Sequence, residues 1–338
     1  MSIKSYGEFN LIHRIRERIQ ATSHDVVIGP GDDAAAIRTT PDTLTLMSTD
    51  TFVEGLDFTE EHSTWTQIGW KCMAANMSDI AAMGGIPKYA MVTLCLPDDL
   101  RIEAVDQLCD GMKDLAQRFG ALIIGGDLSG TPGPITISVT ITGEVPPHQV
   151  LKRSGAQVGD RICVTGHLGG AEAGLRLLIQ SRNDPTRRQS PAFNSVARHR
   201  TPVPRVQEAR LLAESGEVHA MIDISDGLSA DVLHIGEDSG AGITLYADVL
   251  PIDPATVEAA RVLQDDPIQL AMNSGEEFEL VCTVTEKETT RLCRRITDAT
   301  GTPMTVIGEV VPSDSGNTWR NESGTHVLVS GGYDHFLK

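Results

Sequence analysis

The stretch Met221-Ile222-Asp223-Ile224-Ser225-Asp226-Gly227-Leu228 carries the pattern that decides the fold. Apolar residues open it, two carboxylates and a hydroxyl follow, and a helical pattern starts at about Leu228. An apolar run that stops at such polar residues and gives way to a helix is typical of a strand–loop–helix unit. The stretch therefore favours an α/β or α+β fold with mixed sheets.

The same succession recurs on both sides of this stretch. Strands are predicted at 44–49, 90–96, 121–124, 135–145, 161–165, 279–284 and 304–311. Helices are predicted at 8–20, 64–83, around 105–119, from about 171, at 205–215 and near 286–300, and 183–204 is predicted to be a surface loop. Because Pro146-Pro147 breaks the pattern, we expect an N-terminal domain at 1–148 and a C-terminal domain at 149–338.

Composition excludes several function classes. The chain of 338 residues has 46 acidic and 28 basic residues, a formal net charge of −18, which disfavours nucleic acid and anionic membranes as partners. No apolar stretch approaches the ~20 residues needed to span a bilayer. The six cysteines form no CxxC pair, which indicates reduced thiols and a cytoplasmic location.

The placement of certain carboxylates is more informative than their number. Several apolar runs end in Asp next to Gly, Ser or Thr, and Asp79 adds another carboxylate from a predicted helix: Gly31-Asp32-Asp33, Ser48-Thr49-Asp50, Gly125-Gly126-Asp127 and Asp223-Ile224-Ser225-Asp226. Strand ends are where α/β folds open their ligand crevices. Converging carboxylates favour Mg²⁺, which bridges to substrate phosphates, although each motif by itself also suits an ordinary turn.

Other constellations are weaker. Gly125-Gly126 and the loop Gly166–Gly170 could hold phosphate through backbone N–H groups, but glycines in such loops more often serve only to form a turn. Neither loop is a P-loop, and no GxGxxG fingerprint follows a strand. Ser225 lacks the nucleophile elbow, and the ten His residues show no zinc-binding spacing.

Taken in chain order, these motifs resemble the thiamine-monophosphate kinases of the aminoimidazole-ribonucleotide-synthetase-like superfamily. The matching stretches are Gly7-Glu8-Phe9 with Leu11-Ile12, Gly31–Ala35, Ser48–Asp50, Val53–Gly55, Lys71–Asn76, Ser78-Asp79, Gly84-Gly85, Gly125–Asp127, Arg153-Ser154-Gly155 to Gly159-Asp160, Pro202–Arg205, Asp223–Leu228, Gly275-Glu276 and Gly332–Phe336. They extend over nearly the whole chain.

The resemblance implies a two-domain enzyme that dimerises through N-terminal strands and transfers the ATP γ-phosphoryl group directly to thiamine monophosphate. It implies several Mg²⁺ ions held by Asp33, Ser48, Thr49, Asp50, Asp79, Asp127, Asp223 and Asp226. ATP would contact Gly126, Asp127, Arg153 and Ser225. The thiamine substrate would contact position 57, Glu276 and Tyr333.

The chain departs from the family pattern at three places. Asp57 stands where the family usually has a substrate-contacting His, Gly170-Ala171 replaces Asp-Ser, and Ser274 with Glu277 and Phe278 alters Gly-Gly-Glu-Asp-Tyr. Two alternative hypotheses remain. One is a related Mg²⁺- and ATP-dependent kinase or synthetase for another small molecule, and the other is a catalytically dead nucleotide-binding protein.

Overall fold

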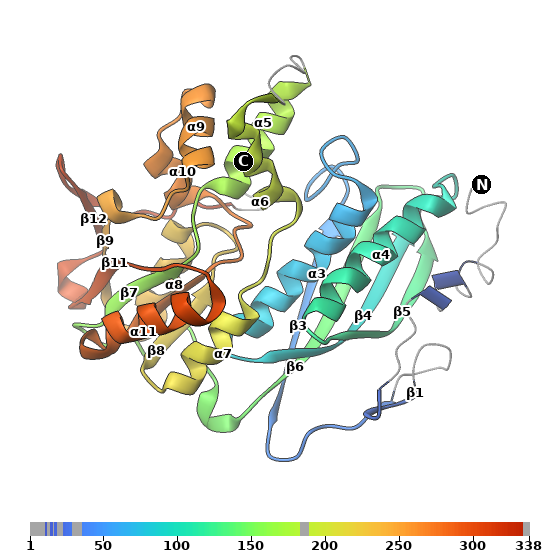
Figure 1. The fold of residues 1–338 in the computed structure, drawn as a ribbon, viewed down its shortest axis with the longest axis horizontal. Coiled ribbons are helices and arrows are strands. Elements are labelled where there is room, and N and C mark those ends of the chain that lie inside the picture. The colour runs from blue at the N-terminus through green and yellow to red at the C-terminus, as the bar shows by residue number, and fades with distance from the viewer. Residues whose placement is uncertain are drawn as a thin grey trace. The chain divides into compact units, whose positions relative to one another are not determined.

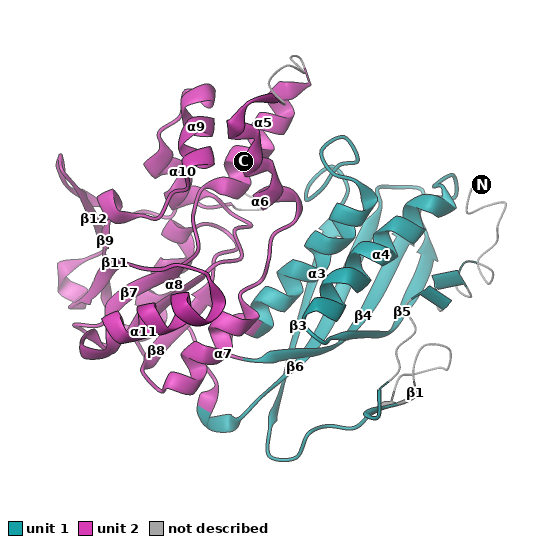
Figure 2. Ribbon diagram, viewed as in Figure 1, with its two compact units in different colours: residues 1–80, 85–148 teal, residues 81–84, 149–338 magenta. Residues whose placement is uncertain are grey.

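The structure is a computed structural model that describes residues 11, 14, 15, 17, 18, 23–28, 36–182 and 189–333. Its chain forms two units, which Figure 2 colours separately. The first comprises residues 1–80 and 85–148, and the second comprises residues 81–84 and 149–338.

The first unit is built on a four-stranded sheet with the order β3-β6-β4-β5 (Figure 1). Its strands are β3 (Leu44–Val53), β4 (Ile86–Leu96), β5 (Leu122–Gly130) and β6 (Thr136–Val145). β4 and β5 are parallel, whereas β6 is antiparallel to both β3 and β4. The helices α3 (Trp65–Ala82) and α4 (Ile102–Arg118) cover one face, and β1 (Val26–Ile28) pairs with β2 (Ala36–Ile37) as a small ribbon.

Side-chain alternation decides which face of this sheet the helices cover. Along β6, Ile137, Val139 and Ile141 are fully buried, and the residues between them are partly exposed. A strand whose every second residue is apolar buries one face and leaves the other open. The helices supply matching apolar stripes, such as Val105, Leu108 and Met112 of α4.

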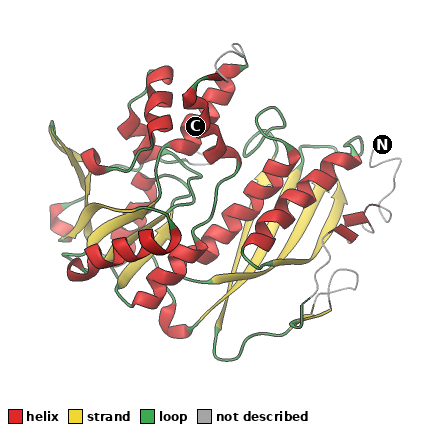
Figure 3. Cartoon of the chain, viewed as in Figure 1, coloured by secondary structure: helices red, strands yellow, loops and turns green. Residues whose placement is uncertain are grey.

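The second unit contains a seven-stranded sheet with the order β13-β12-β9-β11-β7-β10-β8. Figure 3 draws the strands in yellow and the helices in red. Its strands are β7 (Arg161–Thr165), β8 (Val218–Asp223), β9 (Gly242–Tyr246), β10 (Leu280–Val284), β11 (Met304–Val311), β12 (Thr318–Asn321) and β13 (Gly324–Val327). Its α-helices are α5 (Gly170–Ser181), α6 (Val196–Arg200), α7 (Val206–Ser215), α8 (Leu228–Ser239), α9 (Pro254–Leu263), α10 (Pro267–Asn273) and α11 (Glu286–Thr300).

Helices pack on both faces of this sheet. Val232 and Ile235 of α8 belong to one buried cluster with Ile162 of β7 and Ile222 of β8. On the opposite face, Cys293 of α11 lies 4.0 Å, sulfur to sulfur, from Cys163 of β7. A smaller cluster joins α5, α6 and α9 through residues such as Leu177, Val196 and Ala260.

The expectation of a mixed α/β fold with two sheets is confirmed, and the predicted strand 304–311 and helix 286–300 have the observed bounds. The prediction of a surface loop over 183–204 is wrong for 191–200, where a 3₁₀ turn (Pro191–Ser195) and α6 occur. Ala192 and Val196 are buried there, so a polar composition concealed two core contacts. The predicted helix 8–20 lies mostly outside the described residues. None of the described helices is long and apolar enough to cross a membrane.

Candidate active site

In the first unit, Ser48, Asp50 and Asp79 form a polar group on the helix-covered side of the sheet. Ser48 and Asp50 are two residues apart on β3, so both side chains point to the same face. The Ser48 hydroxyl donates a hydrogen bond to Oδ2 of Asp79 on α3. Burial, and then the negative charge of Asp79, raises the pKa of Asp50 to about 6. Carboxylates in this state gain stability from a cation placed among them.

Thr49 points the other way. Its hydroxyl donates to the carbonyl oxygen of Val139 at 3.0 Å and lies 3.1 Å from the Thr140 hydroxyl, on the opposite face of the sheet. The Thr49 side chain is therefore not part of the group formed by Ser48, Asp50 and Asp79.

The expectation that each Asp lies at a strand end is wrong for Asp50 and Asp127. Asp50 lies inside β3, because that strand pairs with β6 along all its ten residues. Asp127 is exposed inside β5, which continues past Gly126 to Gly130 as the edge strand. A Cβ at Gly126 would lie 1.9 Å from the Val92 carbonyl oxygen, so close strand pairing already requires glycine there. Asp33 lies outside the described residues.

In the second unit, the loop after β8 gathers residues that are far apart in the sequence. Asp223 ends β8, as expected, and Ser225 and Asp226 follow in the loop. The Glu276 N–H donates to the Ser225 carbonyl oxygen at 2.7 Å, and the Tyr333 N–H donates to that of Asp226 at 3.0 Å. Main-chain hydrogen bonds thus bring two of the three predicted thiamine contacts to the predicted metal loop.

Asp231, in the first turn of α8, closes the same loop and was missed by sequence reasoning. Its Oδ2 accepts the N–H groups of Asp226 at 3.2 Å and Gly227 at 3.0 Å, so it closes the N-terminus of α8. Burial, together with the negative charges of Asp223 and Asp226, raises the pKa of Asp231 to about 7 against those two hydrogen bonds. The available signal was an acidic residue in the first turn of a predicted helix.

Two further predicted contacts lie in loops. The main-chain carbonyl oxygen of Lys152 accepts a hydrogen bond from the N–H of Met221 at 2.8 Å, which places the neighbouring, exposed Arg153 beside β8. The Asp57 carboxylate accepts the Val53 N–H at 2.7 Å and so closes the turn that follows β3.

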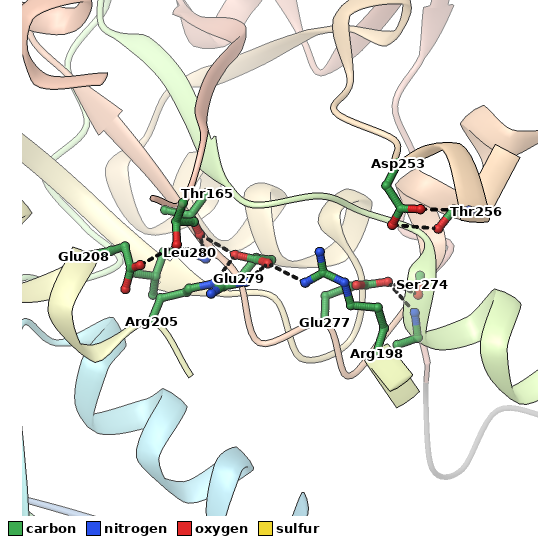
Figure 4. Close-up of polar contacts among 12 residues, drawn as sticks. Thr165, Arg198, Arg205, Glu208, Asp253, Thr256, Ser274, Glu277, Glu279 and Leu280 are labelled. Atoms are coloured by element: carbon green, nitrogen blue, oxygen red, sulfur yellow. Dashed lines mark hydrogen bonds and ion pairs between the residues drawn. The ribbon is translucent and has the colours of Figure 1, made fainter. Parts of the chain in front are cut away.

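The glycine loop Gly166–Gly170 leads into an N-terminus that is already capped. The N–H of Ala171 donates to Oε1 of Glu277 at 3.0 Å, and the N–H of Glu172 donates to Oγ of Ser274 at 3.0 Å. These first-turn donors of α5 are therefore taken by protein side chains, as Figure 4 shows for Glu277 and Ser274.

The described side chains do not form a complete set of metal ligands by themselves. Within the ranges that the structure describes, no group of three or more His, Cys, Asp and Glu side chains is arranged to hold a metal ion. The oxygen donors and the raised pKa of Asp50 nevertheless fit Mg²⁺, which commonly takes one or two carboxylates and completes its shell with water and substrate phosphates.

Both domains of the chain are similar to those of one family of proteins. Residues 31–145 match the N-terminal domain of AIR synthase related proteins, and residues 157–319 match their C-terminal domain. The chain is 34% identical to the thiamine-monophosphate kinase of Bacillus subtilis (strain 168) over 97% of this chain and 99% of that protein. It is 33% identical to that of Escherichia coli (strain K12), with 98% of each covered. The chain belongs to the thiamine-monophosphate kinase family, whose members are phosphotransferases.

Solved structures agree with this assignment. The thiamine-monophosphate kinase of Stenotrophomonas maltophilia K279a has a TM-score of 0.81 and 33% identity, with 94% of this chain and 98% of that one covered. The complex of AaThiL with AMPPCP and TMP has a TM-score of 0.77 and 28% identity, with 99% of each chain covered. Hydrogenase maturation protein HypE in complex with ATP, at 19% identity and a TM-score of 0.77, shares the fold.

Proposed function

We propose that this protein phosphorylates thiamine monophosphate to thiamine diphosphate with ATP as the phosphoryl donor. The similarity to thiamine-monophosphate kinases over nearly the full length supports the activity, and the complex of AaThiL with AMPPCP and TMP supports the substrate pair. The observation that carries the proposal is the attachment of Glu276 and Tyr333 to the Ser225-Asp226 loop.

In this proposal, magnesium is held by Asp33, Ser48, Thr49, Asp50, Asp79, Asp127, Asp223 and Asp226. Because its hydroxyl faces away from Asp50, Thr49 would contribute through its main chain. Gly126, Asp127, Arg153 and Ser225 would contact ATP. Bound Mg²⁺ would neutralise charge on the phosphates, and the protein residues would keep donor and acceptor in line.

The transfer itself needs no covalent enzyme intermediate. A phosphate oxygen of thiamine monophosphate attacks the γ-phosphorus of ATP, and the bond from that phosphorus to the bridging oxygen of ADP breaks. Arg153 can offer its guanidinium fork to a phosphate. Glu276 and Tyr333 would orient the thiamine portion, with the exposed Tyr333 ring available for stacking.

The proposal includes a homodimer formed through the open face of the four-stranded sheet. Met47 is 72% exposed and Met91 is 46% exposed. Their register partners on β6, Thr142 and Thr140, lie on this same face. An uncovered sheet face with large apolar side chains favours a partner subunit.

We also propose a cytoplasmic location, because the six cysteines are free thiols.

The deciding experiment incubates the purified protein with ATP, Mg²⁺ and thiamine monophosphate and separates the products by chromatography. We expect thiamine diphosphate and ADP in equal amounts. ATP binding without thiamine diphosphate, but with ADP formed on another small molecule, would favour the related kinase or synthetase. ATP binding with no ADP released under any condition would favour a nucleotide-binding protein without activity.

A further inference from the structure

The segment Ser274–Glu279 holds an unusual backbone conformation. Glu276 and Phe278 have φ values of +57° and +51°, in the left-handed region that residues with a Cβ seldom occupy. Such residues cost of order 1–3 kcal/mol each and persist only where their surroundings enforce them. A specific set of contacts must therefore hold this segment.

Part of the support is a short ladder to the loop after β8. In addition to the bond from Glu276 to Ser225, the Phe278 N–H donates to the Ile224 carbonyl oxygen at 2.9 Å. The Ile224 N–H donates back to the carbonyl oxygen of Glu279 at 2.8 Å. Glu279 thus anchors the end of the segment at which this ladder begins.

The side chain of Glu279 is fixed by a buried ionic network (Figure 4). Its carboxylate is 0% exposed. Arg205 donates to it twice, from Nε at 2.6 Å and from Nη2 at 2.5 Å, and the Thr165 hydroxyl donates at 2.7 Å. The two-pronged guanidinium contact fixes direction as well as distance. Gly166 leaves the necessary space, because a Cβ there would lie 1.9 Å from a carboxylate oxygen of Glu279.

The network also approaches Glu276 from the side of α6. Nη1 of Arg198 lies 3.5 Å from Oε1 of Glu279. The next residue, His199, is buried and places Nδ1 3.7 Å from Oε2 of Glu276. One short helix therefore contacts both the anchored carboxylate of Glu279 and the partly exposed carboxylate of Glu276.

We infer that Glu279 is a positioning residue: with Arg205 and Thr165 it fixes the start of β10, and it thereby holds Glu276 in place beside Ser225 and Asp226. This inference rests on the proposed function, in which Glu276 contacts thiamine monophosphate. Glu279 does not itself touch the substrate. Its effect is on how well Glu276 is presented.

The test uses three variants of the network. Glu279→Gln removes, at nearly constant shape, the negative charge that faces the guanidinium of Arg205. The double variant Glu279→Leu with Arg205→Met replaces the ion pair by apolar side chains, an exchange that buried pairs often tolerate without loss of stability. Arg205→Lys keeps the charge and loses the fork.

Steady-state kinetics distinguish a role of the ion pair in positioning Glu276 from a role in the stability of the fold alone. We expect Glu279→Gln and the double variant to raise the KM for thiamine monophosphate about tenfold, with the Kd for ATP unchanged within about twofold. Arg205→Lys should show a smaller rise in the same direction. If the double variant folds and has the KM of the unmodified protein, the ion pair serves stability alone and the inference is overturned.

Glu309→Gln provides the matched control. It breaks the ion pair between Arg161 and Glu309, 3.0 Å long, which involves the same strand β7 but not the Ser274–Glu279 segment. We expect its KM for thiamine monophosphate to be unchanged. An increase equal to that of Glu279→Gln would contradict positioning through Glu279.

Amide hydrogen exchange gives a readout that does not depend on activity. The N–H groups of Glu276 and Phe278 should exchange faster in the double variant than in the unmodified protein and in Glu309→Gln. Unchanged exchange at both amides overturns the inference. Absence of thiamine diphosphate with the unmodified protein would instead reject the proposed function, and the exchange data would still decide the positioning role.

Discussion

Asp79 is surrounded by groups that respond to its charge. It accepts the Ser48 hydroxyl, and its negative charge adds to burial in raising the pKa of Asp50. Replacing it by Asn keeps the shape of the side chain and removes one unit of charge. The substitution should therefore reduce the catalytic rate more than the stability of the fold.

We expect Asp79→Asn to lower kcat by about two orders of magnitude, the scale of losing one electrostatic contribution to a transition state. Steady-state kinetics at saturating ATP and Mg²⁺ would measure this, and circular dichroism would report the fold. Asp42→Asn is the control, because Asp42 is exposed and has a φ of +61° that Asn also tolerates. Full activity of Asp79→Asn would exclude Asp79 from the site.

Asp57 tests the acceptor side. We expect Asp57→His to lower the KM for thiamine monophosphate, since an imidazole can donate a hydrogen bond to the acceptor. The same change removes the hydrogen bond from the Val53 N–H, which should cost about 1 kcal/mol of stability. Asp57→Asn retains an acceptor for Val53 and should leave both quantities nearly unchanged. A KM equal in all three proteins would show that position 57 does not contact the acceptor.

At the scale of elements, the N-terminus of α5 shows that one departure from the family pattern can compensate for another. Gly170-Ala171 lacks the carboxylate and hydroxyl of the usual Asp-Ser, and the structure supplies a carboxylate from Glu277 and a hydroxyl from Ser274. A Cβ at Gly170 would lie 2.8 Å from Cγ of Arg198, so the Arg198 side chain fills the space that a longer residue would need.

This cap predicts a pH effect. Burial raises the pKa of Glu277 to about 7, against the hydrogen bonds from Ser274 and Ala171. Because the folded protein holds this proton more tightly than the unfolded chain does, stability from this group is full below the ordinary value of 4.5 and is lost as the pH rises toward 7. Glu277→Gln should therefore flatten the decline of Tm between pH 5 and pH 7.5, measured by calorimetry. Parallel Tm curves for the two proteins would contradict a titration at Glu277.

Periodicity and turn residues predicted several of the regular elements, because they reflect local preferences. The strand 304–311 and the helix 286–300 follow from alternation and from a three- and four-residue spacing. The lengths of β3 and β5 did not follow, since a polar run such as Ser48-Thr49-Asp50 continues as a strand only when a distant partner such as β6 pairs with it.

The candidate site was predicted in part for a related reason. The resemblance to a family indicated the loop residues, and the alternation rule would have separated Thr49 from Asp50 once the strand was known to continue. The buried acids Asp231, Glu277 and Glu279 were not singled out as buried, because an acidic residue is normally exposed. Only the fold brings Arg205 and Thr165 to Glu279.

At the scale of the whole molecule, the exposed apolar side chains on the sheet of the first unit predict how the chain assembles. We expect the double variant Met47→Glu with Met91→Glu to shift a dimer to monomers, because two charges would have to be buried without partners. Sedimentation equilibrium measures the change. Val327→Glu on β13 is the control, because Val327 is as exposed as Met47, at 72%. It should leave the mass of the assembly, as measured by sedimentation equilibrium, unchanged. A dimer that persists in the double variant would place the interface elsewhere.

The strand order of the second unit also bears on the rate at which the chain folds. Among its described strands, only β12 and β13 are neighbours both in the sheet and in the sequence. β7, for example, pairs only with β10 and β11, which lie more than a hundred residues later in the sequence. Closing such long loops costs entropy before any pairing rewards it, and topologies of this kind fold slowly. The second unit should consequently pass through states with unpaired strand edges, and chaperones would then matter most for the later half of the chain.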